Sequence, residues 1–240
     1  MKVLGKGLKS RGRLMHQVDA FIFDMDGVLI DSEPLHFAAF REYLAGLGVD
    51  YGERKHRDFI GRTSREIFLR ILEENPTLDL SADEMILARQ GLFAEAIAKP
   101  LSAMEGTLEL LTALAGRGIR LGLASGSNRF QVETILRNLN YWEAFECVTT
   151  GEEVEQSKPS PQIYQLACAR MKVNPSKCIV IEDSAPGVLA AIRAGSYVVA
   201  VPCGSTRAHD LTPAHEEMKS LAPFPLDEVL SRFDAWHLRG

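Results

Sequence analysis

The sequence predicts an α/β fold, in which a parallel sheet with crossover helices carries an inserted helical subdomain. Two observations predict it. Short apolar runs alternate with helical patterns along most of the chain, which is typical of buried parallel strands and their connections. The long interval between the first and second apolar runs, however, contains only helical patterns. We therefore expect several helices to be inserted after the first strand.

Five apolar runs are the predicted strands. They are apolar throughout rather than alternating, as expected for strands that are covered on both faces. In chain order they are residues 20–23, 119–124, 145–149, 178–181 and 197–201. The predicted crossover helices are residues 106–116, 128–139, 160–172 and 185–194.

Three helices are predicted in the inserted subdomain. The first has the i, i+3, i+4, i+7 spacing of an amphipathic helix, formed by Phe40, Tyr43, Leu44 and Leu47. The other two begin at capping boxes, which pair Thr63 with Glu66 and Ser81 with Glu84. Asn75, which precedes a proline, is expected to end the second helix.

The chain divides into three predicted parts. They are a core at 18–31 and 101–240, a helical cap at 32–100, and a basic tail at 1–17 that we expect to be disordered. The tail has five Lys and Arg residues and no acid, and it lacks the apolar centre of a secretory signal. Its alternatives are a mitochondrial-type presequence and an upstream start, with Met15 as a second candidate initiator.

The composition excludes several classes of protein. With 240 residues, 46% hydrophobic and 25% charged, the chain is expected to be globular rather than disordered or fibrous. Its net charge of −5 argues against nucleic acid as a partner. No apolar run approaches the ~20 residues of a membrane-spanning helix. The four cysteines show no CxxC spacing, which predicts reduced thiols in a cytoplasmic protein.

Polar side chains follow three of the predicted strands. They are Asp24 and Asp26 after the first, Ser125, Gly126 and Ser127 after the second, and Glu182 and Asp183 after the fourth. Lys158 lies in a loop before a helix and can reach the same place. Ligands bind at the carboxyl ends of the strands in an open parallel sheet, so we expect these residues to share one site.

The chemistry of this set indicates phosphoryl transfer. Four carboxylates at one edge resist ionisation unless a cation joins them, and oxygen ligands suit Mg²⁺. Of two neighbouring acids such as Asp24 and Asp26, one that is bound to the metal can stay ionised and attack, while the other stays protonated and serves as the acid. Lys158 and the backbone N–H groups after Ser125 would hold an anion. An anion, Mg²⁺ and an attacking carboxylate together indicate an aspartyl-phosphate intermediate.

Each of these residues also has an ordinary structural interpretation. A pair of acids is common in a chain with 32 of them, serines cap helices, and most lysines are solvated. The shared location of the whole set is what favours a site.

The order of these residues along the chain resembles the four motifs of the haloacid dehalogenase (HAD) superfamily. The matching residues are Asp24 to Gly27, Ser125, Lys158 with its proline, and Glu182 with Asp183.

Residues 24–36 and 181–195 are similar to the beta-phosphoglucomutase-like subfamily, and the resemblance covers about residues 18–220. It implies a Rossmann-like parallel-sheet core with an all-helical cap that closes over the site. The resemblance also implies catalytic roles, with Asp24 as the nucleophile and Asp26 as the general acid and base. It implies that Ser125, Gly126 and Lys158 bind the phosphate. It implies that Mg²⁺ is held by Asp24, the backbone carbonyl of Asp26 and Asp183, with Glu182 as a direct or an outer ligand.

The cap is expected to hold substrate-binding residues. His36 matches a mutase residue that engages the acid/base aspartate, although it also shares a helix stripe with Phe40 and could simply pack there. Arg62 and Arg65 lie at a helix start, where positive charge is unfavourable unless an anion is bound. Arg65 matches the position that binds the distal phosphate in the mutases. Arg89 matches a cap lysine only loosely.

The resemblance implies a Mg²⁺-dependent phosphohydrolase that acts on a small phosphorylated metabolite such as a sugar phosphate. A phosphomutase of the beta-phosphoglucomutase type is the alternative. The mutases have a lysine for the second phosphate where this chain has Asn128, which favours hydrolysis. A receiver domain is a further alternative but has no inserted cap, and a catalytically inactive binding protein would not need all of these groups. We expect a monomer.

Overall fold

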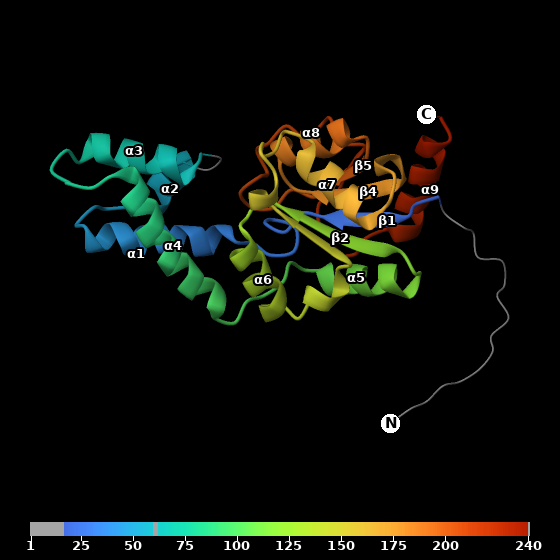
Figure 1. Ribbon diagram of the computed structural model, residues 1–240, viewed down its shortest axis with the longest axis horizontal. Coiled ribbons are helices and arrows are strands. Elements are labelled where there is room, and N and C mark those ends of the chain that lie inside the picture. The colour runs from blue at the N-terminus through green and yellow to red at the C-terminus, as the bar shows by residue number, and fades with distance from the viewer. Residues whose placement is uncertain (1–16, 60–61, 240) are drawn as a thin grey trace, which may run out of the picture.

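A computed structural model of the chain describes residues 17–59 and 62–239, so the predicted basic tail lies almost wholly outside the described residues. The described chain forms a six-stranded sheet in the order β3-β2-β1-β4-β5-β6. Every neighbouring pair of strands is parallel. Helices cover the sheet, and a separate group of helices lies beyond one end of it (Figure 1). The predicted α/β fold with an inserted helical cap is confirmed.

The predicted strands are present with small changes at their ends. They are β1 (Ala20–Phe23), β2 (Arg120–Ser125), β3 (Cys147–Thr150), β4 (Cys178–Glu182) and β5 (Tyr197–Ala200). The prediction missed β6 (Glu216–Glu217), which pairs with the outer side of β5. This strand is short and acidic, so it lacks the apolar run by which the other strands were recognised.

The predicted crossover helices are also present. They are α5 (Thr107–Gly116), α6 (Arg129–Asn138), α7 (Gln162–Met171) and α8 (Ala185–Ala194). A further helix near the end of the chain, α9 (Leu226–His237), was not predicted. Side chains of α5, α6 and α9 share one hydrophobic cluster with the sheet, whereas side chains of α7 and α8 share another.

Alternate residues of β1 explain why the strands are apolar throughout. Phe21 and Phe23 belong to the cluster formed with α5, α6 and α9. Ala20 and Ile22 belong to the cluster formed with α7 and α8. All four side chains are fully buried, because β1 is central in the sheet and helices cover both of its faces.

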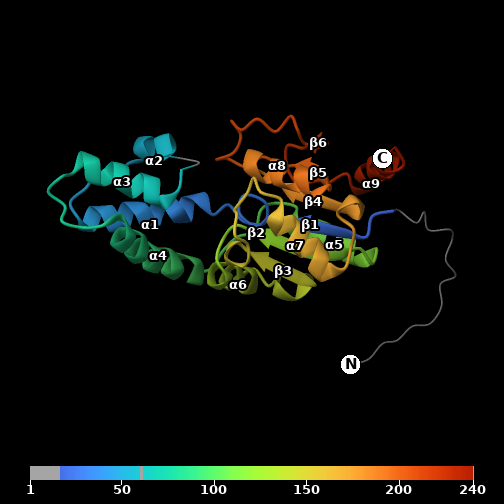
Figure 2. The ribbon, with the colours of Figure 1, turned by 45° about the horizontal axis from the view of Figure 1, so that its top comes forward.

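The helical cap consists of α1 (Glu33–Gly46), α2 (Glu53–Phe59), α3 (Ser64–Glu74) and α4 (Ala82–Ala98). Both predicted capping boxes are formed, at the starts of α3 and α4, whereas α2 was not predicted. The cap has a hydrophobic cluster of its own, to which Phe40 and Phe68 belong. The end of α4 reaches the core, where Phe93 and Ile97 join the main cluster (Figure 2).

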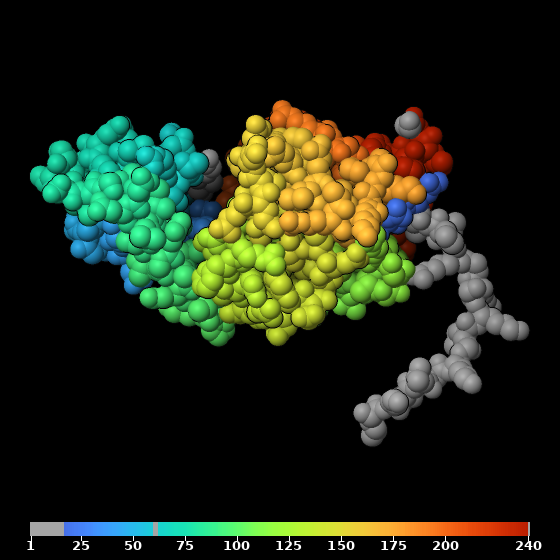
Figure 3. Space-filling view, viewed as in Figure 1, coloured from blue at the N-terminus to red at the C-terminus, as the bar shows by residue number. Residues whose placement is uncertain are grey.

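The cap and the core form two lobes with a notch between them at the top of Figure 3. The chain crosses between the lobes twice, before α1 and after α4. In the part of the chain that the structure describes, no helix is both long enough and apolar enough to cross a membrane.

Candidate active site

The turn after β1 brings two acids to the carboxyl edge of the sheet. Asp24 directly follows β1, and Asp26 lies in the turn itself. Gly27 has a φ of +79°, in the left-handed region that favours glycine. It also packs against Asp183, because a Cβ at this position would lie 2.1 Å from Asp183 Oδ2. Both the turn and the site therefore require glycine after the two acids.

Three carboxylates from two adjacent strands form a buried acidic cluster. Asp24 follows β1, while Glu182 ends β4, which pairs with β1, and Asp183 comes next. One oxygen from each carboxylate lies within 4.8 Å of the others. The relative exposure is 5% for Asp24, 0% for Glu182 and 5% for Asp183. The structure thus brings together three of the predicted site residues in a nearly dry environment.

Lys158 places a positive charge inside this cluster. Its Nζ lies 2.5 Å from Oδ1 of Asp24 and 2.7 Å from Oε1 of Glu182, and it also donates to the carbonyl of Ala124. Burial alone would favour the neutral amine, but the two carboxylates raise the pKa of Lys158 well above its usual value. Lys158 is therefore an ammonium ion that faces the cluster.

Glu182 has both of its oxygens occupied by donors of the protein. Oε1 accepts hydrogen bonds from Lys158 and from the hydroxyl of Tyr164. Oε2 accepts from the N–H of Asp183 and from the N–H and hydroxyl of Ser184. Burial would raise the pKa of Glu182, but Lys158 and these donors lower it. Of the two predicted roles, these contacts favour the outer one, in which Glu182 holds Lys158 in place.

The other two carboxylates of the cluster are less well compensated. Burial, followed by the charges of the neighbouring carboxylates, raises the pKa of Asp24 well above its usual value, against the opposing effect of Lys158. Burial and the charge of Glu182 raise the pKa of Asp183 to about 7. Three acids thus face one ammonium, and a divalent cation would neutralise the excess. Because every donor is a carboxylate oxygen, the residues fit Mg²⁺.

Asp26 lies among hydroxyl groups rather than in the acidic cluster. Its Oδ1 accepts a 2.7 Å hydrogen bond from Ser32, and its Oδ2 accepts from Ser127 at 2.9 Å and from Ser125 at 3.3 Å. Among the described residues, the carboxylates that lie close enough together to share a metal ion are those of Asp24, Glu182 and Asp183, and the side chain of Asp26 is not one of them. Only the main-chain carbonyl of Asp26 therefore remains for its predicted role at a cation.

These residues surround a cleft of about 280 Å³. Its core side is lined by Asp24, Asp26, Asp31, Gly126, Ser127, Lys158 and Asp183, and its cap side by Ser32 and Glu33. The loop after β5 adds Cys203, Ser205 and Thr206. Ser125, a predicted phosphate ligand, is fully buried beneath this surface, where its Oγ accepts the N–H of Ser127. Most of the predicted catalytic groups thus open onto one space.

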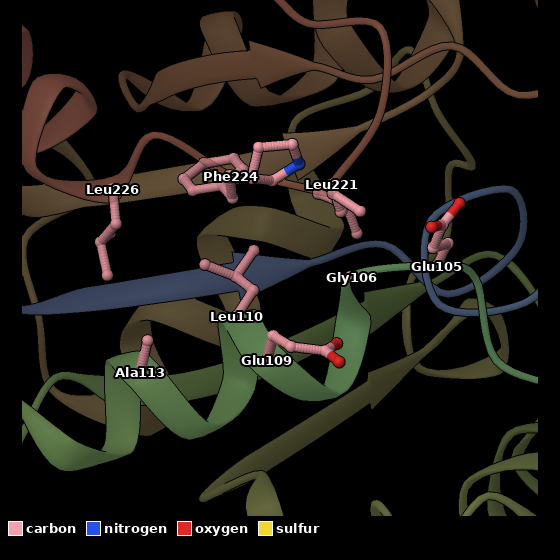
Figure 4. Close-up of a pocket in the computed structure, with 10 residues that line it drawn as sticks. Glu105, Gly106, Glu109, Leu110, Ala113, Leu221, Phe224 and Leu226 are labelled. Carbon is pink, nitrogen blue, oxygen red and sulfur yellow. The ribbon is translucent and has the colours of Figure 1, made fainter.

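A second hollow, of about 490 Å³, lies away from these groups, between α5 and residues 221–226 (Figure 4). Leucine, alanine, proline and phenylalanine side chains line most of it. Its charged lining residues are two acids, Glu105 and Glu109, and none of its described lining residues is a cation or bears a hydroxyl. Its described side chains therefore offer neither a cation nor a hydroxyl to a phosphoryl group, despite the larger volume of the hollow.

His36, on α1, lies at the junction of the cap and the core and is not among the described residues that line the cleft. Its ring is stacked on Phe93 at 4.1 Å between centroids, and its Nδ1 lies 3.0 Å from Nη1 of Arg89. Burial and the charge of Arg89 lower the pKa of His36 to about 4. His36 is therefore neutral at neutral pH. The charge of Asp26 partly opposes this lowering of the His36 pKa, but no hydrogen bond joins the two described side chains.

The structure does not bring the two predicted cap arginines into the cleft. Arg62 is exposed just before α3. Arg65 is also exposed, and its guanidinium is paired with Asp83 on α4. Neither is among the described residues that line the cleft.

Several residues of the site were not predicted from the sequence. Ser32 binds Asp26, Tyr164 binds Glu182, and Thr206 and Cys203 both contact Asp183. Ser32 follows the first acidic motif closely, and that position was the available signal. Tyr164 lies within a helix and the other two lie in a loop, where no local pattern marks them.

The fold and the cluster define an enzyme whose reactive groups gather at the carboxyl edge of a parallel sheet. The chain belongs to the haloacid dehalogenase-like hydrolases, a family that matches residues 18–195. The predicted superfamily is thereby confirmed.

Individual relatives agree with this membership. The phosphorylated carbohydrates phosphatase of Thermotoga maritima is 35% identical, over 74% of this chain and 82% of the relative. Hexitol phosphatase B of Escherichia coli is 32% identical, over 78% of this chain and 85% of the relative. The chain spans 60% of the length of another relative, the bifunctional riboflavin kinase/FMN phosphatase of Arabidopsis thaliana, which is 32% identical over 91% of this chain.

Solved structures show the same architecture. A mutant of CbbY from Rhodobacter sphaeroides, in complex with xylulose-(1,5)bisphosphate, superposes with a TM-score of 0.76 at 29% identity, covering 87% of this chain and 96% of CbbY. A putative beta-phosphoglucomutase from Thermotoga maritima gives a TM-score of 0.76 at 31% identity, covering 90% of this chain and 99% of that structure.

Proposed function

We propose that this chain is a Mg²⁺-dependent phosphohydrolase that cleaves a small phosphorylated metabolite, a sugar phosphate, through an aspartyl-phosphate intermediate on Asp24. The observation that carries the proposal is the buried contact of Asp24 with Lys158 beside two further carboxylates. Relatives that are named phosphatases of phosphorylated carbohydrates and of hexitols support the substrate class. A monomeric state and a cytoplasmic location stay predictions.

In the first proposed step, an oxygen of Asp24 attacks phosphorus, and the bond from phosphorus to the leaving oxygen breaks. Asp26 donates a proton to that oxygen, so the product leaves as an alcohol. In the second step, water attacks the phosphorus of the aspartyl phosphate, and Asp26 takes a proton from the water. Inorganic phosphate leaves and the Asp24 carboxylate is restored.

Lys158 and the cation site divide the electrostatic work. Lys158 Nζ is placed to contact a phosphoryl oxygen next to Asp24, where charge develops during transfer. Mg²⁺, held by Asp24, Asp183 and the carbonyl of Asp26, would supply further charge stabilisation. The raised pKa of Asp24 makes this positive charge necessary, because Asp24 attacks only as a carboxylate.

The contacts around the cleft favour hydrolysis over the mutase reaction. A mutase has to hold a second phosphate. The amide of Asn128 accepts the N–H of Gln131 and so caps α6, while Arg65 is paired with Asp83. The guanidinium of Arg129 lies over the ring of Trp142, at 5.4 Å. Asn128, Arg65 and the neighbouring Arg129 therefore all have partners outside the cleft. Arg62, the other cap arginine, is exposed and is not among the described residues that line the cleft.

We expect Mg²⁺-dependent phosphate release from sugar and hexitol monophosphates, and EDTA should abolish it until Mg²⁺ is restored. A colorimetric phosphate assay across a panel of phosphorylated metabolites measures this. With beta-glucose 1-phosphate and a catalytic amount of glucose 1,6-bisphosphate, the expected product is inorganic phosphate or none. Faster formation of glucose 6-phosphate than of phosphate would establish the mutase instead, and full turnover without metal would exclude the proposed cation site.

The role of Asp26 predicts a dependence on the leaving group. Asp26→Asn should nearly abolish hydrolysis of a sugar phosphate, whose alkoxide needs a proton in order to leave. An aryl phosphate has a better leaving group, so its kcat should fall much less. Steady-state kinetics on both substrates give the comparison, with Asp50→Asn as an exposed acidic control. Equal losses on the two substrates would show that Asp26 has a structural role.

A further inference from the structure

We infer that Thr206 and Cys203, in the loop after β5, are positioning residues that orient the Asp183 carboxylate toward the cation site. The inference rests on the proposed function, and it adds residues that contact a ligand of the cation rather than the cation itself. Thr206 and Cys203 are buried, with relative exposures of 8% and 4%. Both nevertheless border the cleft, so this loop forms one of its walls.

Both side chains bind the same oxygen of Asp183. The hydroxyl of Thr206 donates to Oδ2 at 3.0 Å, and the thiol of Cys203 donates to Oδ2 at 3.3 Å. Within the described residues, no donor is bonded to the other oxygen, Oδ1. One carboxylate oxygen is therefore held by the loop, and the second is left for the acidic cluster.

The direction of the Thr206 hydrogen bond is set by its surroundings. Its Oγ1 accepts the backbone N–H of Cys203 at 3.0 Å. The hydroxyl proton has two acceptors within reach, Oδ2 of Asp183 at 3.0 Å and the sulfur of Cys203 at 3.4 Å. A carboxylate can only accept and sulfur is a weak acceptor, so the proton is the one shared with Asp183. The Thr206 hydroxyl thus links the loop to the carboxylate, because it accepts a hydrogen bond from the loop backbone and donates one to Asp183.

Two other contacts restrict the movement of this unit. Gly27 lies so close to Asp183 that an added Cβ would meet Oδ2 at 2.1 Å. Further along the same loop, the ring of His209 accepts the N–H of Ala185 at the start of α8. Asp183 is therefore enclosed by the turn after β1 on one side and by a tethered loop on the other.

The chemistry of the two donors suits an outer layer of a cation site. A hydroxyl and a thiol are neutral, so they orient Asp183 without cancelling the charge that attracts a cation. Lys158, in contrast, neutralises the carboxylates that it contacts. Partners that orient a metal ligand in this way typically contribute ~10- to 100-fold to metal affinity or activity.

The test compares Thr206→Val, which keeps the shape but removes the hydroxyl, with Thr206→Ser, which keeps the hydroxyl. Isothermal titration calorimetry of each purified protein with MgCl₂ measures the dissociation constant without turnover. Thr206→Val should raise this constant by ~10- to 100-fold, and Thr206→Ser should stay near wild type. Cys203→Ala should have a smaller effect, because a thiol is a weak donor.

A second measurement separates positioning from damage to the fold. Saturating Mg²⁺ should restore most of kcat in Thr206→Val, because Asp183 is still present. A lower melting temperature with an unchanged Mg²⁺ constant would overturn the inference and show a purely structural role. The variant Asp183→Asn tests the proposed function itself: wild-type Mg²⁺ affinity in that variant would disprove the cation site, whatever Thr206→Val does.

Discussion

Asp24→Asn should lower kcat by on the order of 10⁴-fold or more, the scale on which removal of a nucleophile acts. An amide is a far weaker nucleophile than a carboxylate, and no other carboxylate among the described residues is bonded to Lys158 at the cleft surface. Glu182, the other partner of Lys158, is fully buried and occupied by other donors. It therefore cannot replace Asp24 as the attacking group.

The same variant should keep its fold, and in metal-free buffer it should be more stable than wild type. The raised pKa of Asp24 means that its surroundings disfavour the negative charge, chiefly through burial and neighbouring carboxylates. Asn removes that charge at nearly constant shape. Thermal unfolding in EDTA measures the shift, and Asp19→Asn, an exposed acid at the other end of β1, is the matched control.

Acid quenching followed by peptide mass spectrometry tests the intermediate directly. Wild-type protein mixed with substrate should carry a phosphoryl group on the peptide that contains Asp24, and Asp24→Asn should carry none. Substantial turnover by Asp24→Asn, or a phosphoryl group on another residue, would refute the covalent route through Asp24.

The sheet was predictable because its strands are buried on both faces. Phe21 and Ile22 face opposite clusters, so β1 is apolar at every position and stands out in the sequence. The pair Glu216–Glu217 has no such constraint at the sheet edge. The helix α9, in contrast, carries a detectable signal: Leu226, Val229, Leu230 and Phe233 have helical spacing and are all buried.

The site was predictable only where residues follow strand ends. Asp24 and Asp183 come together because β1 and β4 are neighbours in the sheet. Thr206 reaches the same place from a loop whose path depends on tertiary packing. Arg65 shows the converse limit. Its position at a helix start is evident in the sequence, but its partner Asp83 lies on another helix, and only the packing of α3 against α4 determines that contact.

Lys158→Met should reduce kcat/KM by ~10²- to 10³-fold, the loss typical of removing an electrostatic group from a transition state. Lys158 is the one cation among the described residues lining the cleft, and methionine keeps much of its length without the charge. Lys219→Met, at an exposed position, is the matched control. A change of less than tenfold would show that Lys158 does not contact the transferring group.

The same substitution should also destabilise the metal-free protein, by ~3–5 kcal/mol, as expected when one partner of a buried ion pair is removed. Glu182, Asp24 and Asp183 would then share a buried site with no ammonium. Mg²⁺ should recover part of the lost stability but not the lost activity, because it cannot take the position of Nζ. Lys158→Arg keeps the charge, so it should retain more stability than Lys158→Met.

The sign of the pH dependence provides an independent check. Asp183 has a folded pKa of about 7, above its unfolded value of 3.8, so protonation of this group stabilises the fold, and that contribution is lost as the pH rises through about 7. Without Lys158, Glu182 also loses the partner that lowers its pKa. Metal-free Lys158→Met should therefore be more stable in mild acid than at neutral pH. Urea unfolding across this range measures the trend, and a variant whose stability rises toward neutral pH would contradict the assignment of Lys158 as the charge that balances this cluster.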